Sequence, residues 1–409
     1  MSRLRVGLEV LAESGRDRFA GARLGLLMNQ ASVNRQLSSA CDVLHTAFPG
    51  QLRLLFSPQH GFWGEQQANM IESADTHDPQ TGLPVCSLYA ATRRPAPERL
   101  HEIDILLIDL QDTGTRVYTF IWTMLECLRA AAETGTEVAV LDRPNPLGGC
   151  VTEGPLIEPG LESFVGGAAI PMRHGLTIGE LARLLNAELA LGVRLHVIPV
   201  ENWNRSQLWP ATERLWVPPS PNMPRWETTI VYPGQVLLEG TNLSEGRGTT
   251  RPFEVCGAPW IEPDELVEAL GTAASPGLIL QPVRFRPTFD KWSGQVCGGV
   301  ALHVTDAPAV RSFEFTIRLL LTLQRLYPGR LRLLDPPYEY ETIRPPLDIL
   351  HGSPRLREAL DAAESGNHLD VVEHLCGLDQ VAWHRRIAAW QLYGPPRTAK
   401  TSGSSQTPE

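Results

Sequence analysis

The fold is decided by the sequence IDILLIDL at residues 103–110, which leads directly into QDTG at residues 111–114. A short, almost unbroken apolar run is typical of a strand that is buried on both faces of a sheet. The polar segment that follows marks the end of this strand. Further runs of the same kind lie at Arg23–Asn29, Leu52–Ser57, Pro84–Leu88, Glu137–Asp142 and Arg194–Val200.

Helical patterns separate several of these predicted strands. The clearest are Tyr118–Glu133 and Thr177–Ala190, and Thr177 with Glu180 fits an N-terminal capping box. Alternating strands and helices predict an α/β fold with a doubly wound, mostly parallel sheet. We assign this first domain to residues 1–200.

The composition of the chain changes after residue 200. Residues 201–260 are rich in Trp, Pro, Gly, Asn and Thr, which predicts a loop segment with one strand at Thr229–Leu238. Residues 261–393 predict a smaller α+β domain, and residues 394–409 predict a disordered tail. In the α+β part we expect helices at Pro263–Leu270, Val310–Leu326, Pro354–Ala363 and Val371–Trp390, and strands at Leu278–Phe285 and Gly298–Val304.

The charge of the chain restricts its partners. The 409 residues carry a formal net charge of −10 without a dense basic cluster, so we expect no nucleic-acid partner. No apolar run approaches the roughly 18–20 residues needed to cross a bilayer, so we expect no membrane partner. Lys291 and Lys400 are the only lysines. An anion site must therefore use arginine, whose guanidinium binds carboxylates through two N–H groups.

Two features predict a cytoplasmic protein. Residues 1–18 are charged and lack the apolar stretch of about 7–15 residues that a secretory signal peptide needs. The seven cysteines show no CxxC spacing, and their number is odd. We therefore expect reduced, mostly buried thiols, as is usual in the cytosol.

Several common chemistries lack their motifs in this sequence. No GxGxxG follows a predicted strand and no GxxxxGK[ST] occurs, which disfavours a nucleotide-linked enzyme. HExxH, zinc-type histidine pairs and GxSxG are also absent. We therefore expect no cofactor, no metal ligands and no serine nucleophile.

Polar segments follow the predicted strands where a ligand would bind. They are Asn29-Gln30, SPQHGFWGE at residues 57–65, DLQDTG at residues 109–114 and DRPNP at residues 142–146. Open α/β sheets bind ligands beyond the carboxyl ends of their strands, so these segments predict one active-site edge. Considered by itself, Asp109 favours a structural role as a turn cap, and Asp112 fits a structural or a functional role equally. His60 and Glu65, in their glycine-bounded loop, favour a functional role.

The densest motif is EGTNLSEGRGTTRPFE at residues 239–254, which combines three acids, two arginines and several hydroxyl groups. A loop of carboxylates and arginines beside tryptophans suits a sugar acid better than a nucleotide. Upstream, PPSPNMP at residues 218–224 is typical of a stiff connector, and it offers one hydrogen-bonding side chain, Asn222.

Together these motifs resemble the NamZ-like exo-β-N-acetylmuramidases, a glycoside hydrolase family that was long a domain of unknown function. The resemblance extends from about residue 5 to the end of the last predicted helix. It rests on residues 58–65, 87–89, 109–119, 141–146, 163–166, 171–175, 219–224 and 239–254.

The resemblance implies a fold and an activity. The fold would be a Rossmann-like domain followed by a smaller domain, with the active site in the cleft between them. The activity would be release of N-acetylmuramic acid (MurNAc) from the non-reducing end of peptidoglycan fragments. In the expected cytoplasmic location, the substrates would be wall fragments imported for cell-wall recycling. The partner would thus be a small carbohydrate.

One position departs from the family. Many members carry Glu in a Pro-Glu-His-Gly motif, and this chain has Gln59 there. An amide cannot donate a proton as a carboxylic acid does. Two classes of function therefore stay open: an exo-glycosidase that uses another acid, and a catalytically altered sugar-binding or regulatory protein on the same fold.

Most glycosidases use two carboxyl groups. We predict that Glu65 is the acid, with Asp112 or Glu245 as base or charge stabiliser and His60 beside them. Substrate-assisted cleavage through the N-acetyl group is the alternative. The predicted substrate-binding residues are Asn29, Gln59, Arg143, Asn145, Arg173, His174, Asn222, Glu239, Asn242, Arg247 and Arg251. Among the arginines, we expect Arg251 first and Arg143 second to bind the lactyl carboxylate that distinguishes MurNAc from N-acetylglucosamine.

Overall fold

The larger sheet of the protein has seven strands in the order β3-β4-β2-β1-β5-β6-β7. The computed structural model describes residues 3–67, 70–271, 276–362 and 369–394. The strands are β1 (Leu24–Met28), β2 (Leu52–Ser57), β3 (Thr76–His77), β4 (Pro84–Ser87), β5 (Ile105–Asp109), β6 (Glu137–Leu141) and β7 (Leu195–Ile198). All neighbouring pairs are parallel except β3 and β4.

This strand order confirms the predicted α/β class. Counted along the chain without the short antiparallel β3, the parallel strands have the order 3-2-1-4-5-6. That order defines the Rossmann-type doubly wound sheet. Each of the six strands predicted from apolar runs coincides with one of these parallel strands.

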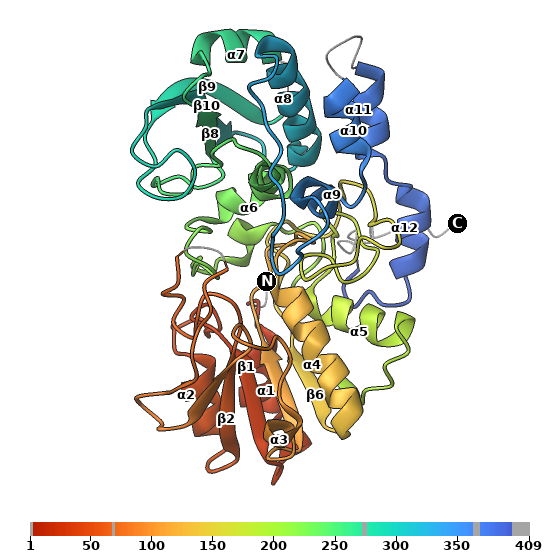
Figure 1. Ribbon diagram of the computed structural model, residues 1–409. Coiled ribbons are helices and arrows are strands. Elements are labelled where there is room, and N and C mark those ends of the chain that lie inside the picture. Colours follow the sequence, from red (N-terminus) through yellow and green to blue (C-terminus); the bar gives the residue numbers. More distant parts are fainter. Residues whose placement is uncertain (1–2, 68–69, 272–275, 363–368, 395–409) are drawn as a thin grey trace, which may run out of the picture.

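The apolar runs build two cores because successive strand residues point to opposite faces of the sheet. In β5, Ile105 and Leu107 belong to one buried cluster, and Leu106 and Ile108 belong to the other. The first cluster packs against α1 (Gly7–Ser14) and α2 (Ala40–Ala47). The second packs against α3 (Pro97–Leu100), α4 (Phe120–Thr134) and α5 (Ile178–Glu188). The sheet is therefore covered on both faces (Figure 1).

The capping box predicted at Thr177 is present at the start of α5. The Thr177 side chain accepts a hydrogen bond from the Glu180 amide, and the Glu180 carboxylate accepts one from the Thr177 amide. These two bonds satisfy N–H groups that have no partner within the helix, which fixes where α5 begins.

A second, smaller sheet lies at the other end of the molecule (Figure 1). It is antiparallel, with the order β8-β10-β9, and consists of β8 (Val255–Ala258), β9 (Leu278–Phe285) and β10 (Cys297–Val304). Helices α7 (Pro263–Leu270) and α8 (Ser312–Leu326) accompany it. Side chains of β10 and α8 belong to the same buried cluster as α4 and α5, so one continuous core joins the two sheets.

The prediction of a strand at Thr229–Leu238 is wrong, because this segment is helical. It forms α6 (Trp226–Gln235) and the 3-10 helix η3 (Val236–Gly240). The β-branched residues suggested a strand, but α6 is packed tightly beneath α8. A Cβ on Gly234 would lie 1.9 Å from the Ser312 carbonyl oxygen. Tertiary packing has overridden local propensity here.

The single helix predicted at Val371–Trp390 is also wrong, because the segment contains two helices. They are α11 (Leu369–Cys376) and α12 (Gln380–Ile387), and Asp379 caps α12 by accepting a hydrogen bond from the Ala382 amide. Helices α9 (Pro346–His351) and α10 (Arg355–Ala362) precede them. The tail predicted to be disordered lies almost entirely outside the described residues.

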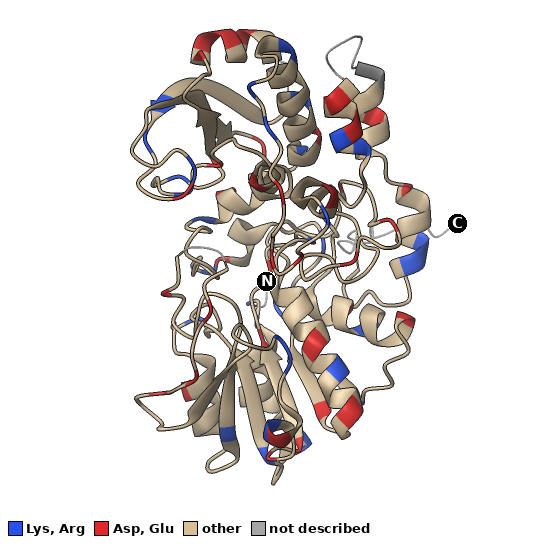
Figure 2. Cartoon of the chain, viewed as in Figure 1, with Lys and Arg blue, Asp and Glu red and all other residues tan. Residues whose placement is uncertain are grey.

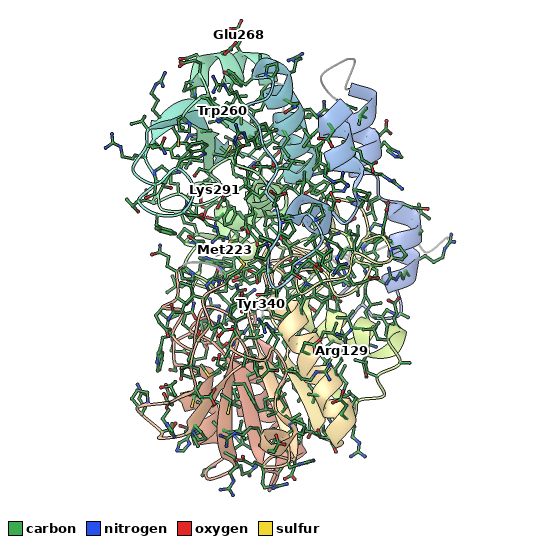
Figure 3. The ribbon with its side chains drawn as sticks, in the orientation of Figure 1. Arg129, Met223, Trp260, Glu268, Lys291 and Tyr340 are labelled. Atoms are coloured by element: carbon green, nitrogen blue, oxygen red, sulfur yellow. The ribbon has the colours of Figure 1, made fainter. Side chains whose placement is uncertain are left out.

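Charged residues are interspersed along the chain, with acidic residues gathered on α7 (Figure 2). None of the helices within the described ranges has the length and apolarity that a bilayer crossing requires. Figure 3 locates Met223 and Tyr340 in the middle band of the molecule, whereas Trp260 and Glu268 lie near the end formed by the small sheet. That middle band contains the site described next.

Candidate functional site

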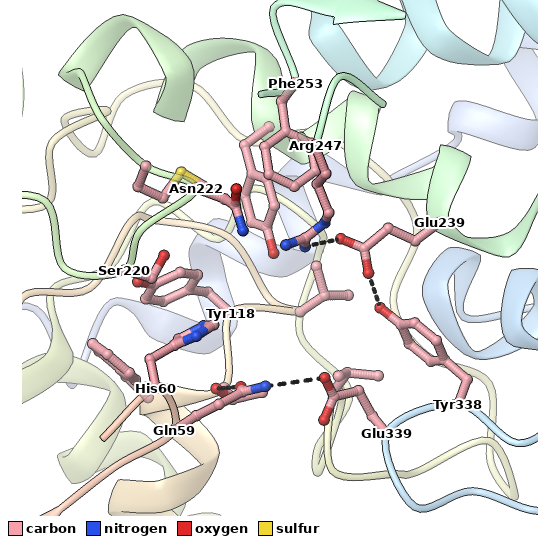
Figure 4. Close-up of a pocket in the computed structure, with 16 residues that line it drawn as sticks. Gln59, His60, Tyr118, Ser220, Asn222, Glu239, Arg247, Phe253, Tyr338 and Glu339 are labelled. Atoms are coloured by element: carbon pink, nitrogen blue, oxygen red, sulfur yellow. Dashed lines mark hydrogen bonds and ion pairs between the residues drawn. The ribbon is translucent and has the colours of Figure 1, made fainter. Parts of the chain in front are cut away.

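A cavity lies between the carboxyl edge of the large sheet and the second part of the chain. The segment after β2, the start of α4, the proline-rich segment, η3 and the segment before α9 all contribute to its wall (Figure 4). Its lining residues are Gln59, His60, Val117, Tyr118, Thr119, Phe120, Val165, Ser220, Asn222, Met223, Tyr232, Glu239, Arg247, Phe253, Tyr338 and Glu339.

Gln59 is fixed in this wall by hydrogen bonds at both ends of its amide. Its Oε1 accepts from the Thr119 hydroxyl at 2.7 Å, and its Nε2 lies 3.0 Å from the Tyr89 hydroxyl. The same nitrogen donates to Glu339 Oε1 at 3.2 Å. The amide orientation follows from these partners, because only the nitrogen can donate.

His60 lies beside Gln59 in a backbone conformation that is unusual for a side-chain-bearing residue, with φ at 76°. Its Nδ1 lies 2.7 Å from the Gln66 carbonyl oxygen and therefore carries the proton. Burial lowers the pKa of His60 to about 4. At neutral pH the ring is thus uncharged and offers Nε2 as an acceptor.

Glu239 and Arg247 form the charged side of the cavity. Arg247 Nη2 donates to Glu239 Oε1 at 2.6 Å, and the Tyr338 hydroxyl donates to Glu239 Oε2, also at 2.6 Å. Arg247 Nη1 is buried and has no hydrogen-bond partner among the described residues. A buried guanidinium N–H without a partner is unfavourable, and an acceptor on a bound ligand would satisfy it.

A second cavity adjoins the first and shares Glu239, Arg247 and Tyr338 with it. Glu245 lies in its wall, 2.9 Å from Lys291 Nζ and 3.1 Å from Arg247 Nε. Burial favours the neutral form of Glu245, but Lys291 and Arg247 outweigh it and lower the pKa. Glu245 is therefore ionised and neutralised by its two cations.

Glu339 is the acidic residue of the pocket that sequence reasoning missed. Its side chain is 3% exposed, and it accepts hydrogen bonds from Gln59 and, at 2.7 Å, from the Tyr89 hydroxyl. Burial and the nearby Glu239 raise its pKa above the ordinary value for a glutamate. The local signal was weak, since Glu339 is an acid between two tyrosines after a Pro-Pro pair.

The predicted acid, Glu65, lies outside this cavity wall. Its side chain is exposed, and its carboxylate accepts a hydrogen bond from the Trp63 amide at 3.1 Å. Of the other predicted site residues, Gln59, His60, Asn222, Glu239 and Arg247 line the first cavity. Asn222 also donates from Nδ2 to the Gln67 carbonyl oxygen at 3.0 Å.

Asp112 and His174 lie deeper in the sheet edge and contact each other. Asp112 Oδ2 accepts from the Gly114 amide at 2.8 Å and lies 3.2 Å from His174 Nε2. Arg173 beside them forms a buried ion pair with Glu153 at 3.0 Å. None of these four residues lines either cavity.

The remaining predicted residues are engaged within the protein. Arg143 Nη2 donates to Asp109 Oδ2 at 2.8 Å, and Arg251 Nε lies 3.4 Å from Glu254 Oε2. The three amides bind backbone carbonyls: Asn29 that of Pro219, Asn145 that of Leu176, and Asn242 that of Arg330. Among the described residues, no group of three or more His, Cys, Asp and Glu side chains could hold a metal ion.

This arrangement defines a class of protein. A Rossmann-type sheet that meets a second domain at a pocket with two carboxyl groups, an arginine and several aromatic rings is typical of an α/β enzyme of acid–base chemistry.

Comparison with known proteins specifies the family. Residues 24–227 match the family described as "Exo-beta-N-acetylmuramidase NamZ, N-terminal", and residues 230–393 match its C-terminal counterpart. The chain therefore belongs to the NamZ family, as its motifs indicated.

Similar proteins agree with this assignment. The peptidoglycan β-N-acetylmuramidase NamZ of Bacillus subtilis is 44% identical over 81% of this chain and 80% of that protein. Two crystal structures of DUF1343 family proteins from Bacteroides fragilis also match. One is 34% identical with a TM-score of 0.86, covering 96% of this chain and 99% of that one. The other is 27% identical with a TM-score of 0.72, covering 96% and 100%.

Proposed function

We propose that this protein is a glycoside hydrolase that releases MurNAc from the non-reducing end of peptidoglycan fragments. The observation that carries the proposal is the pairing of two differently held carboxyl groups, Glu239 and Glu339, in one pocket. Glycosidases use two such groups, one as proton donor and one as charge stabiliser, nucleophile or base.

Arg247 supplies the recognition of the lactyl carboxylate in this proposal. It is the arginine of the sequence-derived set that lines the pocket, and its Nη1 is the buried N–H that lacks a partner among the described residues. A guanidinium binds a carboxylate more strongly than it binds a neutral acceptor. N-acetylglucosamine lacks the lactyl group and gains nothing from this contact.

Hydrolysis of a chromogenic MurNAc glycoside, with the matched N-acetylglucosamine glycoside as control, tests the function. We expect release from the MurNAc compound to be much faster than release from the N-acetylglucosamine control. Tight binding of MurNAc without turnover would instead support a sugar-binding protein on the same fold.

Arg247→Lys tests the recognition step while keeping the positive charge beside Glu239. The variant should lower kcat/KM for MurNAc substrates by about 10–150-fold, since one charge-assisted hydrogen bond contributes about 1.5–3 kcal/mol. Residual activity toward the N-acetylglucosamine compound should change little. Equal losses for both compounds would show that Arg247 does not bind the lactyl group.

We further propose that the enzyme works in the cytoplasm on wall fragments taken up for recycling. The seven cysteines, all within the described part of the chain, are free thiols, which suits a reducing compartment. Cell fractionation provides the measurement. Recovery of the protein from the culture supernatant of intact cells would contradict this location.

A further inference from the structure

Glu339 lies where the large sheet and the second part of the chain meet. Its backbone φ is 44°, in the left-handed region that side-chain-bearing residues rarely adopt. A pair of backbone hydrogen bonds between Tyr338 and Glu341 closes the turn that holds it. This geometry aims the Glu339 carboxyl at Gln59 (Figure 4). An unfavourable backbone conformation that is retained at a pocket is a frequent mark of a functional residue.

The partners of Glu339 orient its carboxyl group without neutralising it. Gln59 donates to Oε1 at 3.2 Å and the Tyr89 hydroxyl donates to Oε2 at 2.7 Å. Both partners are uncharged, and no arginine or lysine of the described residues lies within ion-pair distance of Glu339. Each carboxyl oxygen keeps a second lone-pair position, which leaves one for a proton directed into the pocket.

The second carboxyl group of the pocket is held differently. Glu239 forms an ion pair with Arg247, whereas burial and the charge of Glu239 raise the pKa of Glu339. One carboxyl group is thus held by a cation and the other by neutral donors, and two carboxyl groups in different environments are the arrangement that acid–base catalysis needs. Gln59, in the loop where sequence reasoning sought the acid, cannot supply a proton, but the Glu339 carboxyl lies 3.2 Å from its amide nitrogen.

We propose that Glu339 is the general acid of the reaction and that Gln59 and Tyr89 are its positioning residues. The proposal rests on the proposed glycosidase function. The proton on Glu339 moves to the glycosidic oxygen while the bond from C1 to that oxygen breaks. The bonding electron pair leaves with the oxygen, which departs as the alcohol of the next sugar. Water adds its hydroxide to C1 and releases a proton that restores the acid.

A comparison of leaving groups tests this role with Glu339→Gln. The natural MurNAc–N-acetylglucosamine disaccharide needs a proton on its leaving oxygen, whereas a 2,4-dinitrophenyl MurNAc glycoside does not. Loss of the acid should lower kcat for the disaccharide by about 10²–10⁴-fold. Turnover of the dinitrophenyl compound should fall less than about tenfold, which also shows that the variant is folded. Glu341→Gln, two residues away and paired with Arg344, controls for disturbance of the loop.

The pH profile gives a second readout. A general acid must be protonated, so wild-type kcat/KM for the disaccharide should fall as pH rises through the pKa of Glu339. The groups that face Glu339 are Gln59, Tyr89, Tyr232, Glu239, Arg247, Tyr338 and Tyr340. Because the Tyr89 hydroxyl lowers the pKa of Glu339, Tyr89→Phe should move this alkaline limb to higher pH.

The outcomes separate the proposals. A wild-type enzyme that hydrolyses neither compound would remove the proposed function and the acid role with it. An active wild type whose Glu339→Gln variant loses both activities equally while folded would overturn the acid role alone. If Glu339→Gln is unfolded, the pH profile of Tyr89→Phe decides instead. An alkaline limb of kcat/KM at the same pH as in the wild type would then overturn the acid role of Glu339. If Glu65→Gln loses activity on the disaccharide but keeps it on the dinitrophenyl compound, Glu65 is the general acid.

Discussion

Two clusters of polar side chains lie at the same edge of the large sheet. In one cluster the charged groups contact other protein groups, and in the other they line the pocket. The closed cluster consists of Asp112, Glu153, Arg173 and His174, whose charged groups lie against one another and against the backbone. The open cluster consists of Gln59, His60, Glu239, Arg247 and Glu339, which line the pocket.

The difference shows why polar motif residues at a strand end are ambiguous from sequence. Both clusters are buried, and both are rich in charge. In the closed cluster Asp112 Oδ1, Arg173 Nε and His174 Nε2 also have no hydrogen-bond partner among the described residues, but the cluster lines neither cavity. Its charges are paired within the protein, so its chief consequence is stability. In the open cluster Arg247 keeps an N–H group for a ligand and Glu339 is oriented by neutral donors. The predictions below test this division.

The largest effect on the free energy of unfolding is expected from Arg173→Met, in the closed cluster. Arg173 is 2% exposed and is ion-paired with Glu153, which also accepts a hydrogen bond from the Phe313 amide. Removing the cation leaves a buried carboxylate unpaired, which typically costs about 3–5 kcal/mol of unfolding free energy. Urea denaturation at neutral pH measures this loss.

A matched double variant sharpens this test. Arg173→Met with Glu153→Gln should recover part of the lost stability, because no buried charge is then left without a partner. Activity per folded molecule should stay close to wild type in both variants. If Arg173→Met is stable and loses MurNAc binding, the residue contacts substrate, as the sequence-based prediction had it.

Sequence reasoning identified the sheet and one side of the pocket. The strands were predictable because most of their residues are apolar, and Gln59 and His60 because they follow a strand end. Glu239 and Arg247 were found through their dense motif. Glu339 was not, because it is 280 positions from Gln59 and its turn carries no glycine or repeated polar pattern. Only the fold brings these two residues together.

An intermediate effect on the free energy of unfolding is expected in the open cluster, where His60 titrates as the pH falls. Its pKa is lowered from 6.5 to about 4 by burial, so the unfolded chain binds a proton first as the pH falls. The stability that this group contributes is complete above pH 6.5 and is lost as pH falls through 4. From pH 7.5 to 4.5 the loss is about 2.5 kcal/mol of unfolding free energy.

His60→Asn should remove this part of the acid sensitivity, since asparagine tolerates the positive φ at this position. Unfolding free energies of the wild type and the variant at the two pH values provide the measurement. His351→Gln is a matched comparison outside the pocket wall, because burial also lowers the pKa of His351 to about 4. It should remove a similar part of the acid sensitivity. An unchanged slope in His60→Asn would mean that the ring is charged in the folded protein.

The smallest effect is expected from Arg251→Ala, which belongs to neither cluster. The Arg251 side chain is 32% exposed, and its Nε lies 3.4 Å from Glu254 Oε2. Glu254 would keep its ion pair with Arg225 and its hydrogen bond from the Thr228 hydroxyl. A partly exposed pair of this kind is worth about 0–1 kcal/mol, so stability should change by no more than that.

For MurNAc substrates, kcat/KM of Arg251→Ala should fall less than about fivefold, because Arg251 lines neither cavity. A loss of tenfold or more that spares the N-acetylglucosamine compound would show instead that Arg251 turns into the pocket when substrate binds. The lactyl contact would then belong to the arginine that the sequence first indicated.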